Sequence, residues 1–295
     1  MPNLRTTIKG LFPSIIWQPL SEARYALQRA AQWPAATLHP WRRESIARLA
    51  ALKDIHKGER CFIIGNGPSL KRTDVSKLRG EFTFGMNRIY LAFPEWGFRT
   101  SFLVSVNDLV IEQCVDDFLA LDMPRFFSWR SHRFFPNSPI HQSTNLPIYQ
   151  STNLPIYQFT NPQSPTFLHT TYTGPKFAPD VTGRLWEGGT VTYVCLQLAF
   201  YMGFEQAILI GVDHSFASQG EPNTTVTSNG DDPDHFDGRY FGKGFRWQLP
   251  DLASSEAGYR MAQQAYESAG REVVDATVGG KLQIFPKVEY GTLFE

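Results

Sequence analysis

The segment Cys61-Phe-Ile-Ile-Gly-Asn-Gly-Pro-Ser-Leu70 constrains the fold of this chain more than any other. Its leading apolar residues predict a strand that is buried on both faces, as in a parallel sheet. Gly65 and Gly67 allow positive φ or a close approach of the backbone to a ligand, while Pro68 and Ser69 suit the first turn of a helix. A glycine turn before a helix N-terminus favours phosphate, because unpaired N–H groups and the helix dipole attract anions. A tight turn without a ligand would use the same residues.

Size and charge narrow the class of protein. The chain has 295 residues, with 28 basic and 28 acidic side chains, so one α/β domain with appendages is the simplest organisation. A net charge of zero gives no overall attraction to nucleic acid, and we expect no nucleic-acid partner. Cys61, Cys114 and Cys195 lie far apart in apolar surroundings, which predicts buried thiols in a reducing compartment. No apolar run reaches the roughly 18 residues of a membrane span and no signal peptide is evident, so we expect a cytoplasmic protein.

The N-terminal part of the chain, residues 1–57, predicts a helical extension ahead of a domain at residues 58–295. Ser21–Trp33 and Trp41–Ile55 carry apolar residues at helical spacing, and Pro34 and Pro40 should interrupt the chain between them. Basic residues interleaved with Trp, Leu and Ile could rest on the inner face of a membrane or on a partner chain, including a second copy in a homo-oligomer. Packing against the main domain is the favoured interpretation.

Polar residues follow the next two predicted strands at the point where each strand ends. Asn87 closes the first of these strands, and Asn107 and Asp108 close the second. In open parallel sheets, ligands bind beyond the carboxyl ends of the strands. We therefore expect these side chains to meet Asn66 of the glycine turn at one crevice, where amides could contact a base or a sugar. Each residue alone could instead be a turn residue, because Asn and Asp favour turns for local reasons.

The second half of the chain supplies another turn, a buried helix and a predicted lid. Gly189 and Thr190 precede a nearly continuous apolar run, which predicts a buried helix, and the strand after it ends in Asp213. Residues from about 217 to 250 are polar at first and then rich in aromatic and basic side chains, which predicts a lid. A tandem octapeptide predicts a surface insertion over about residues 140–163, to which we assign no chemistry.

The motifs in this order resemble a known superfamily. Gly65-Asn-Gly-Pro-Ser-Leu70, Asn87, Gly189-Thr190 and Gly211-Val-Asp213 are similar to motifs of the bacterial CMP-sialic-acid-dependent sialyltransferases. They are equally similar to the archaeal 6-hydroxymethylpterin diphosphokinase and its relatives. The resemblance covers roughly residues 60–215. We therefore expect a Rossmann-like α/β fold: a mostly parallel sheet with helices on both faces, an N-terminal helical extension and a lid in the C-terminal half.

The resemblance to the sialyltransferases implies transfer of a sugar from a CMP-sugar to a glycan acceptor, without a bound metal or a permanently bound cofactor. It implies a histidine of the lid as general base and a tyrosine hydroxyl on the leaving phosphate, for which His235 and Tyr240 are the candidates. His214, directly after Asp213, is a rival base. The residues implied around the nucleotide are Gly65, Asn66, Gly67, Ser69, Asn87, Asn107, Asp108, Gly189, Thr190 and Asp213.

Two other functions stay open. A diphosphokinase would use ATP with magnesium, which requires carboxylates near the phosphates. Its pattern has an acid at the second strand end and an Asp-rich motif at the third, whereas this chain has Asn87 and only Asp108 after Asn107. The glycosyltransferase interpretation is therefore favoured. The third possibility is a nucleotide-binding protein without catalysis.

Overall fold

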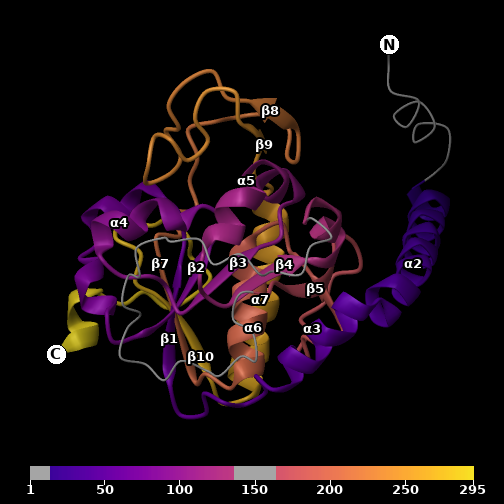
Figure 1. The fold of residues 1–295 in the computed structure, drawn as a ribbon, viewed down its shortest axis with the longest axis horizontal. Helices are drawn as coiled ribbons and strands as arrows, with labels where there is room; N and C mark the ends of the chain where they lie inside the picture. The colour runs from indigo at the N-terminus through magenta and orange to yellow at the C-terminus, as the bar shows by residue number, and fades with distance from the viewer. Residues whose placement is uncertain (1–13, 136–163) are drawn as a thin grey trace.

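Eight strands form one sheet in the order β10-β7-β1-β2-β3-β4-β5-β6, and every pair of neighbours is parallel (Figure 1). The structure, a computed structural model, describes residues 14–135 and 164–295. The predicted α/β fold with a mostly parallel sheet is confirmed. The strands are β1 (Arg60–Ile64), β2 (Phe82–Met86), β3 (Phe102–Ser105), β4 (Arg125–Ser128), β5 (Thr166–Thr171), β6 (Arg184–Trp186), β7 (Gln206–Ile210) and β10 (Glu272–Asp275).

Strand β1 lies in the interior of the sheet, between β7 and β2. Its apolar residues are fully buried. Successive side chains point to opposite faces of a strand, and here Cys61 and Ile63 join one hydrophobic core while Phe62 and Ile64 join the other. A strand with a core on each side must be apolar at every position, which is why the segment lacks the alternation of a half-exposed strand.

Helices cover both faces of the sheet, as predicted. On one face lie α6 (Val191–Met202), nearly every residue of which is buried, and α7 (Leu252–Ser268), which packs against it. On the other lie α4 (Phe93–Trp96), α5 (Asp108–Ala120) and several short 3₁₀ helices. The 3₁₀ helices are η1 (Pro68–Arg72), η2 (Val75–Leu78), η3 (Ile89–Ala92), η4 (Trp129–Phe134) and η5 (Gly291–Phe294).

The N-terminal extension is helical, and of the interruptions predicted at Pro34 and Pro40 only the one at Pro40 occurs. Helix α2 (Ser14–Leu38) runs through Pro34, and the chain turns only at His39, where Pro40 opens α3 (Pro40–Ala50). The interruption predicted at Pro34 was therefore wrong. Pro34 and the residue one turn before it, Ala30, are exposed, so water can satisfy the carbonyl that lacks a proline N–H donor.

The two N-terminal helices differ in how they meet the main domain. Helix α3 packs against β5, and the Ser45 hydroxyl oxygen accepts a hydrogen bond of 2.9 Å from the backbone N–H of Phe167. Most of α2 is exposed, including Leu20 (58%), Leu27 (72%) and Leu38 (63%). No helix within residues 14–135 and 164–295 is long and apolar enough to span a bilayer.

The remaining parts of the chain compare differently with the predictions. Strands β5 and β6 extend the sheet beyond β4 and were not predicted, because both are short and polar residues interrupt their apolar pattern. The predicted insertion at about 140–163 lies outside the described residues. The predicted lid contains an antiparallel pair, β8 (Thr225–Thr227) and β9 (Arg246–Gln248), which lies over one end of the sheet (Figure 1).

The glycine turn after β1 packs directly against the turn after β7. The N–H of Gly67 donates to the carbonyl oxygen of Gly211 at 2.9 Å. A Cβ on Gly65 would lie 2.3 Å from that same oxygen, and a Cβ on Gly67 would lie 1.8 Å from Asp213 Oδ2. Both glycines are therefore required by a close approach within the protein itself, whether or not a ligand also contacts them.

We expect Gly65→Ala to lower the free energy of unfolding by about 1–3 kcal/mol, because the new methyl group would overlap a backbone carbonyl that cannot rotate away. The measurement is guanidinium-induced unfolding followed by circular dichroism. Gly80→Ala is the matched control, since nothing lies within 4 Å of a Cβ at that position. Equal stability of the two variants would contradict the close approach.

Candidate functional site

A cavity opens beyond the carboxyl ends of β1, β2, β3 and β7, between the start of α6 and the predicted lid. The predicted site residues largely meet there, and the three asparagines share one crevice as expected. Ten of them line the cavity: Gly65, Asn66, Gly67, Asn87, Asn107, Gly189, Thr190, Asp213, His235 and Tyr240. Ser69 and Asp108 do not. Whether these residues bind a ligand or catalyse a reaction stays a prediction.

The cavity has two walls that belong to opposite faces of the sheet. Val191 at the start of α6 and Tyr259 of α7 belong to the core on one face. Tyr240, Phe241 and Trp247 of the predicted lid belong to the core on the other face. A ligand in the cavity would therefore lie between a helix N-terminus and a wall of aromatic side chains.

Among residues 14–135 and 164–295, one buried polar atom of Asn66 and one of Tyr240 have no well-aligned hydrogen-bond partner. The Asn66 side-chain nitrogen donates to the carbonyl oxygen of Met86 at 3.1 Å, but its Oδ1 accepts no hydrogen bond. The Tyr240 hydroxyl is also buried, and although the Asn87 amide is close, no well-aligned hydrogen bond joins them. Burial raises the pKa of the Tyr240 phenol, against smaller opposing effects of Arg88 and Asn87. The phenol is therefore neutral and able to donate a proton to a hydrogen bond.

The other two strand-end asparagines have structural hydrogen bonds. Asn87 has positive φ (49°), and its Oδ1 accepts from the Ser105 hydroxyl at 2.9 Å. Asn107 is the N-cap of α5, where its Oδ1 accepts from the backbone N–H groups of Leu109 and Val110. Both side-chain oxygens therefore have the structural roles of turn and cap residues that the alternative interpretation expects. Both side chains nevertheless border the cavity.

His235 is held by a buried carboxylate. Its Nδ1 lies 2.7 Å from Oδ2 of Asp232, and the same oxygen accepts from the backbone N–H of Phe241 at 3.0 Å. A carboxylate on Nδ1 favours the tautomer that leaves Nε2 as the basic atom. The His235 ring also stacks on Tyr240 with ring centroids 4.0 Å apart. The rival base, His214, lies 3.2 Å from Glu256 through its Nε2.

The predicted lid is attached to the strand ends. The N–H of Phe236 donates to the carbonyl oxygen of Asn66 at 2.9 Å. Arg88, directly after Asn87, donates to the carbonyl oxygens of Arg239 and Tyr240. These bonds hold the segment that carries His235 and Tyr240 against the carboxyl end of the sheet.

The predicted phosphate position after β1 is occupied by a side chain of the protein. Asp213 accepts from the Ser69 hydroxyl at 2.7 Å and from the Ser69 backbone N–H at 3.3 Å. Ser69 is buried, and η1 is a five-residue 3₁₀ helix rather than the start of an α-helix. The expectation of free N–H groups at this turn was therefore wrong. The start of α6, at Gly189 and Thr190, borders the cavity, as do the first turns of α5 and α7.

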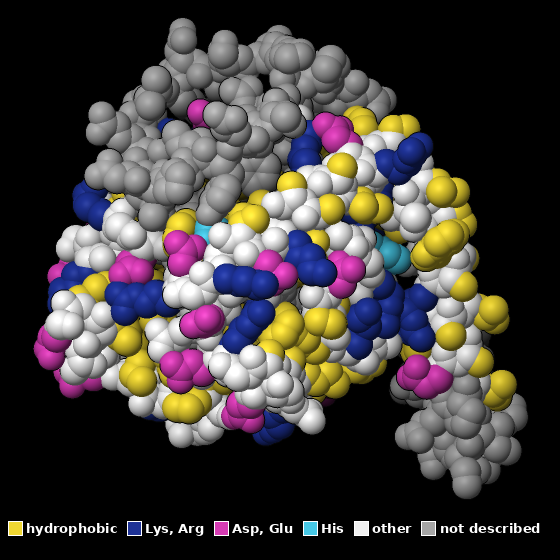
Figure 2. Space-filling view, turned by 90° about the horizontal axis from the view of Figure 1, so that it is seen from below, with side chains coloured by type: hydrophobic (Ala, Val, Ile, Leu, Met, Phe, Trp, Pro, Cys, Tyr) yellow, Lys and Arg dark blue, Asp and Glu magenta, His cyan; other side chains and the backbone are white. Residues whose placement is uncertain are grey.

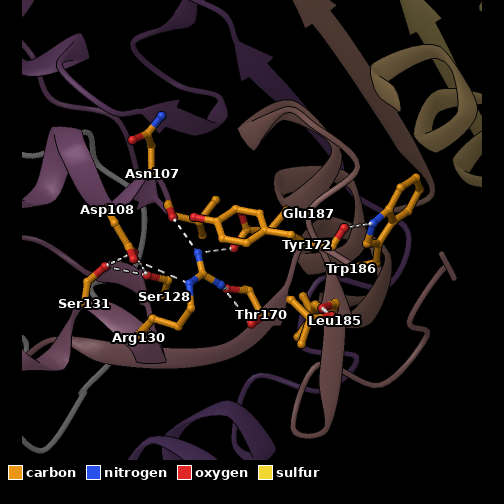
Figure 3. A network of polar contacts seen from close by, with 12 residues as sticks. Asn107, Asp108, Ser128, Arg130, Ser131, Thr170, Tyr172, Leu185, Trp186 and Glu187 are labelled. Atoms are coloured by element: carbon orange, nitrogen blue, oxygen red, sulfur yellow. Dashed lines mark hydrogen bonds and ion pairs between the residues drawn. The ribbon is translucent and has the colours of Figure 1, made fainter. Parts of the chain in front are cut away.

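Asp108 does not line the cavity but points into a polar network that the sequence did not predict (Figure 3). Its Oδ1 accepts from the hydroxyls of Ser128 and Ser131, and its Oδ2 lies 3.5 Å from Arg130 Nε. Asn107, one residue earlier, points in another direction (Figure 3). The two side chains diverge because Asp108 is the first residue of α5, and successive side chains of a helix point about 100° apart.

Arg130 is the centre of this network. It pairs with Glu187 at 2.8 Å, donates to Thr170, and lies 4.1 Å above the centre of the Tyr172 ring. Burial alone would lower the pKa of Arg130, but Glu187, Tyr172 and Asp108 together raise it, so the guanidinium stays charged. Burial raises the pKa of Glu187 despite Arg130. Because Glu187 directly precedes Gly188 and Gly189, the pair holds the turn that opens α6.

Within the described residues, no group of three or more His, Cys, Asp or Glu side chains is arranged to hold a metal ion. The acids nearest the cavity already accept hydrogen bonds. Asp234 accepts from the N–H groups of Ala217 and Ser218, and Asp232 accepts from Asp234 N–H as well as His235.

Comparison with known proteins identifies a family. Residues 43–219, more than half of the chain, match the family described as 6-hydroxymethylpterin diphosphokinase MptE-like. The match includes the strand ends and the start of α6, and it stops before His235 and Tyr240. None of the curated proteins matches the chain. Among solved structures, a MAf glycosyltransferase from Magnetospirillum magneticum AMB-1 is similar, with 14% identity and a TM-score of 0.46 over 92% of this chain. The chain spans 42% of that glycosyltransferase.

We expect Glu187→Gln to lower the free energy of unfolding by about 3 kcal/mol, because it leaves the buried charge of Arg130 with a weaker partner. Glu112→Gln is the matched control: Glu112 pairs with Arg246 at a similar 2.9 Å, but both side chains are exposed. That change should cost less than about 1 kcal/mol. Urea-induced unfolding measures both, and equal losses would show that burial of the Arg130 pair has no special role.

Proposed function

Since the chain belongs to the 6-hydroxymethylpterin diphosphokinase MptE-like family, we propose that it is a nucleotide-dependent transferase. We propose further that it moves a sugar from a CMP-sugar donor to a hydroxyl group of a glycan acceptor without a bound metal. The observation that carries the proposal is the pair of unpartnered buried atoms at the cavity, Asn66 Oδ1 and the Tyr240 hydroxyl oxygen.

Unpartnered buried polar groups point to a ligand that completes them. Leaving such a group without a hydrogen bond costs about 1–3 kcal/mol, and native structures leave few of them. Asn66 Oδ1 would accept from an amino or hydroxyl group of the ligand, while the Tyr240 hydroxyl would donate to a ligand oxygen. A nucleotide-sugar offers both kinds of group. The position beyond the carboxyl ends of parallel strands is the usual one for nucleotides in such sheets.

His235 is the proposed general base. Its Nε2 would take the proton of the acceptor hydroxyl as that oxygen forms a bond to the anomeric carbon of the donor sugar. The bond between the anomeric carbon and the phosphate oxygen breaks, and CMP leaves with the electron pair. Asp232 would stabilise the protonated imidazole through Nδ1, at a distance of 2.7 Å.

The leaving phosphate belongs on the opposite wall. A displacement of this kind needs the base and the leaving group on opposite sides of the sugar. The stack of His235 on Tyr240 puts both on one wall, so we assign the phosphate to the start of α6 at Gly189 and Thr190. There the helix dipole and N–H groups favour negative charge. Tyr240 then contacts the sugar or acceptor instead of the phosphate.

The family description favours a second candidate, diphosphate transfer from ATP with magnesium. Magnesium requires carboxylate oxygens directed at the phosphates. In this arrangement Asp213 accepts from Ser69, Asp234 accepts from backbone N–H groups, and Asp108 pairs with Arg130. These residues do not fit a magnesium site as arranged, and we derive no step through one. The remaining candidate, nucleotide binding without catalysis, would leave the His235–Asp232 pair without a role.

The first prediction concerns the ligand. We expect CMP to raise the melting temperature without magnesium, since a ligand at 100 times its dissociation constant adds about 2.7 kcal/mol of stability. The measurement is a thermal-shift screen with CMP, CDP, UDP, GDP and ATP, each with and without magnesium. Stabilisation by ATP only with magnesium would overturn the proposal in favour of the diphosphokinase.

Tyr240→Phe tests the unpartnered hydroxyl. We expect the variant without ligand to be as stable as the wild type or slightly more stable, because the lost hydroxyl has no hydrogen bond. Its affinity for the ligand identified by the screen should fall by about 1 kcal/mol, or fivefold. Denaturant unfolding and calorimetric titration give the two quantities. A loss of stability without a loss of affinity would contradict a ligand contact.

His235→Ala tests the base. We expect the transfer rate to fall by about 10²–10⁴-fold, while the nucleotide dissociation constant changes little, because a base acts in the chemical step. Asp232→Asn should reduce the rate less. His214→Ala is the control for the rival base, and a large rate loss in that variant with normal turnover by His235→Ala would reassign the role.

A further inference from the structure

Four cationic side chains gather where helix α2 meets the edge of the sheet, away from the cavity. Arg29 comes from α2, Arg42 from α3, Lys176 from the loop after β5, and Arg184 from β6. Seen from below, Lys and Arg side chains form a dark blue group between α2 and the body of the protein (Figure 2). These four residues are called the edge cluster below.

Two guanidinium groups of the edge cluster converge on Gly174. A Cβ on this glycine would lie 2.9 Å from Arg29 Cζ and 3.1 Å from Arg184 Nη1. Arg29 donates to the Thr173 hydroxyl at 2.9 Å, and Arg184 donates to the carbonyl oxygens of Thr173 and Gly174. All of these acceptor oxygens are uncharged. The two guanidinium groups therefore approach each other without a negative charge between them.

No carboxylate neutralises the edge cluster. Within residues 14–135 and 164–295, none of its four cations forms an ion pair with an acid. The nearby acid Asp180 accepts from the N–H and hydroxyl of Thr182 and offsets the charge of Lys176 only in part. Residues 1–13 and 136–163 contain no Asp or Glu in their sequence. These two segments therefore hold no acid that could neutralise the edge cluster.

Among the described residues, the buried Arg42 of the edge cluster has hydrogen-bond partners for only part of its guanidinium group. Arg42 is 1% exposed, and its Nη2 donates to the Thr182 carbonyl oxygen, but its Nε and Nη1 have no hydrogen bond. The neighbouring His169, opposite Arg184 in the sheet, has a buried Nε2 that is also unpartnered. Native proteins seldom leave several buried polar atoms unsatisfied in one place.

Burial disfavours the charged forms of these groups, and neighbouring cations add to the effect at His169 and Arg184. Burial, followed by Arg42, Arg184, Arg130 and Lys176, lowers the pKa of His169 to about 4. Burial and Arg29 lower the pKa of Arg184, and burial lowers that of Arg42 to about 10. An anion at this edge would oppose each of these shifts.

We propose that the edge cluster binds a phosphate-bearing anion, which joins α2 to the edge of the sheet through Arg29, Lys176 and Arg184. Guanidinium groups match phosphate oxygens in two-point hydrogen bonds. Ala36 is buried, but most other side chains of α2 from Leu20 onward are exposed, so an anion held from both sides would fix the helix. This inference does not depend on the proposed transferase activity.

The phosphate could belong to a soluble compound or to a lipid headgroup. The chain offers a reason to test lipid, because Leu20, Leu27 and Leu38 fall on one face of α2 and are exposed. Apolar side chains lie along this part of the surface beside the blue group (Figure 2). A helix with such a face can lie on a bilayer when basic residues accompany it.

Hydrogen exchange of the full chain tests the proposal. The soluble probes are inorganic phosphate and diphosphate, compared with chloride at equal ionic strength, and the lipid probes are vesicles of phosphatidylcholine with or without phosphatidylglycerol. We expect slower amide exchange in α2 with phosphate or diphosphate if the source is soluble. Protection only with phosphatidylglycerol vesicles would support the same site with a lipid source. No protection of α2 by any probe would overturn the proposal.

Variants separate this site from the cavity. Arg29→Gln with Lys176→Gln should weaken anion binding at least tenfold and abolish the protection of α2. Arg24→Gln, an exposed cation on the same helix, should leave both unchanged. Tyr240→Phe should also leave them unchanged, because it alters only the cavity. Normal protection of α2 in the double variant would overturn the proposal, and so would an equal loss in Arg24→Gln, which would indicate attraction to charge in general.

Discussion

The close contact between the turns after β1 and β7 is the constraint on which the rest of the site depends. Gly67 donates to the carbonyl oxygen of Gly211, and Asp213 accepts from Ser69. No side chain fits between the two backbones, so only glycine allows β1 and β7 to end side by side at this distance. The carbonyl of Asn66 then holds the predicted lid through Phe236. The walls of the cavity are thus positioned by backbone packing.

The acids of the chain serve structure more than they serve the cavity. Asp213 holds the turn after β1, Asp108 pairs with Arg130, and Asp232 orients His235. Besides Asp213 and Asp234, the polar side chains that line the cavity are amides, imidazoles, hydroxyls and phenols. This division is the reason that the proposed function uses a general base and a helix N-terminus.

The segment that follows β5 connects the edge cluster with the start of α6 at the cavity. The loop after β5 begins at Tyr172, which covers Arg130, and it carries Gly174 and Lys176 of the edge cluster before the chain reaches Arg184. Arg130 in turn pairs with Glu187, just before the turn that opens α6. The stretch from Tyr172 to Glu187 therefore supplies Lys176 and Arg184 of the edge cluster as well as the partner of Arg130.

The sequence alone determined the class of fold, the central strands and the helix after Gly189, because buried strands and helices require continuous apolar runs that are visible in one dimension. It also predicted that Asn66, Asn87 and Asn107 would share a crevice, since parallel strands end at the same edge. Only the tertiary structure decided that Asp213 occupies the turn after β1, that Asp108 points to Arg130, and that β5 and β6 extend the sheet. The first outcome depends on a partner 144 residues away, and the second on rotation about a helix axis. The third depends on the pairing of short strands with a broken apolar pattern, and no local pattern records any of these.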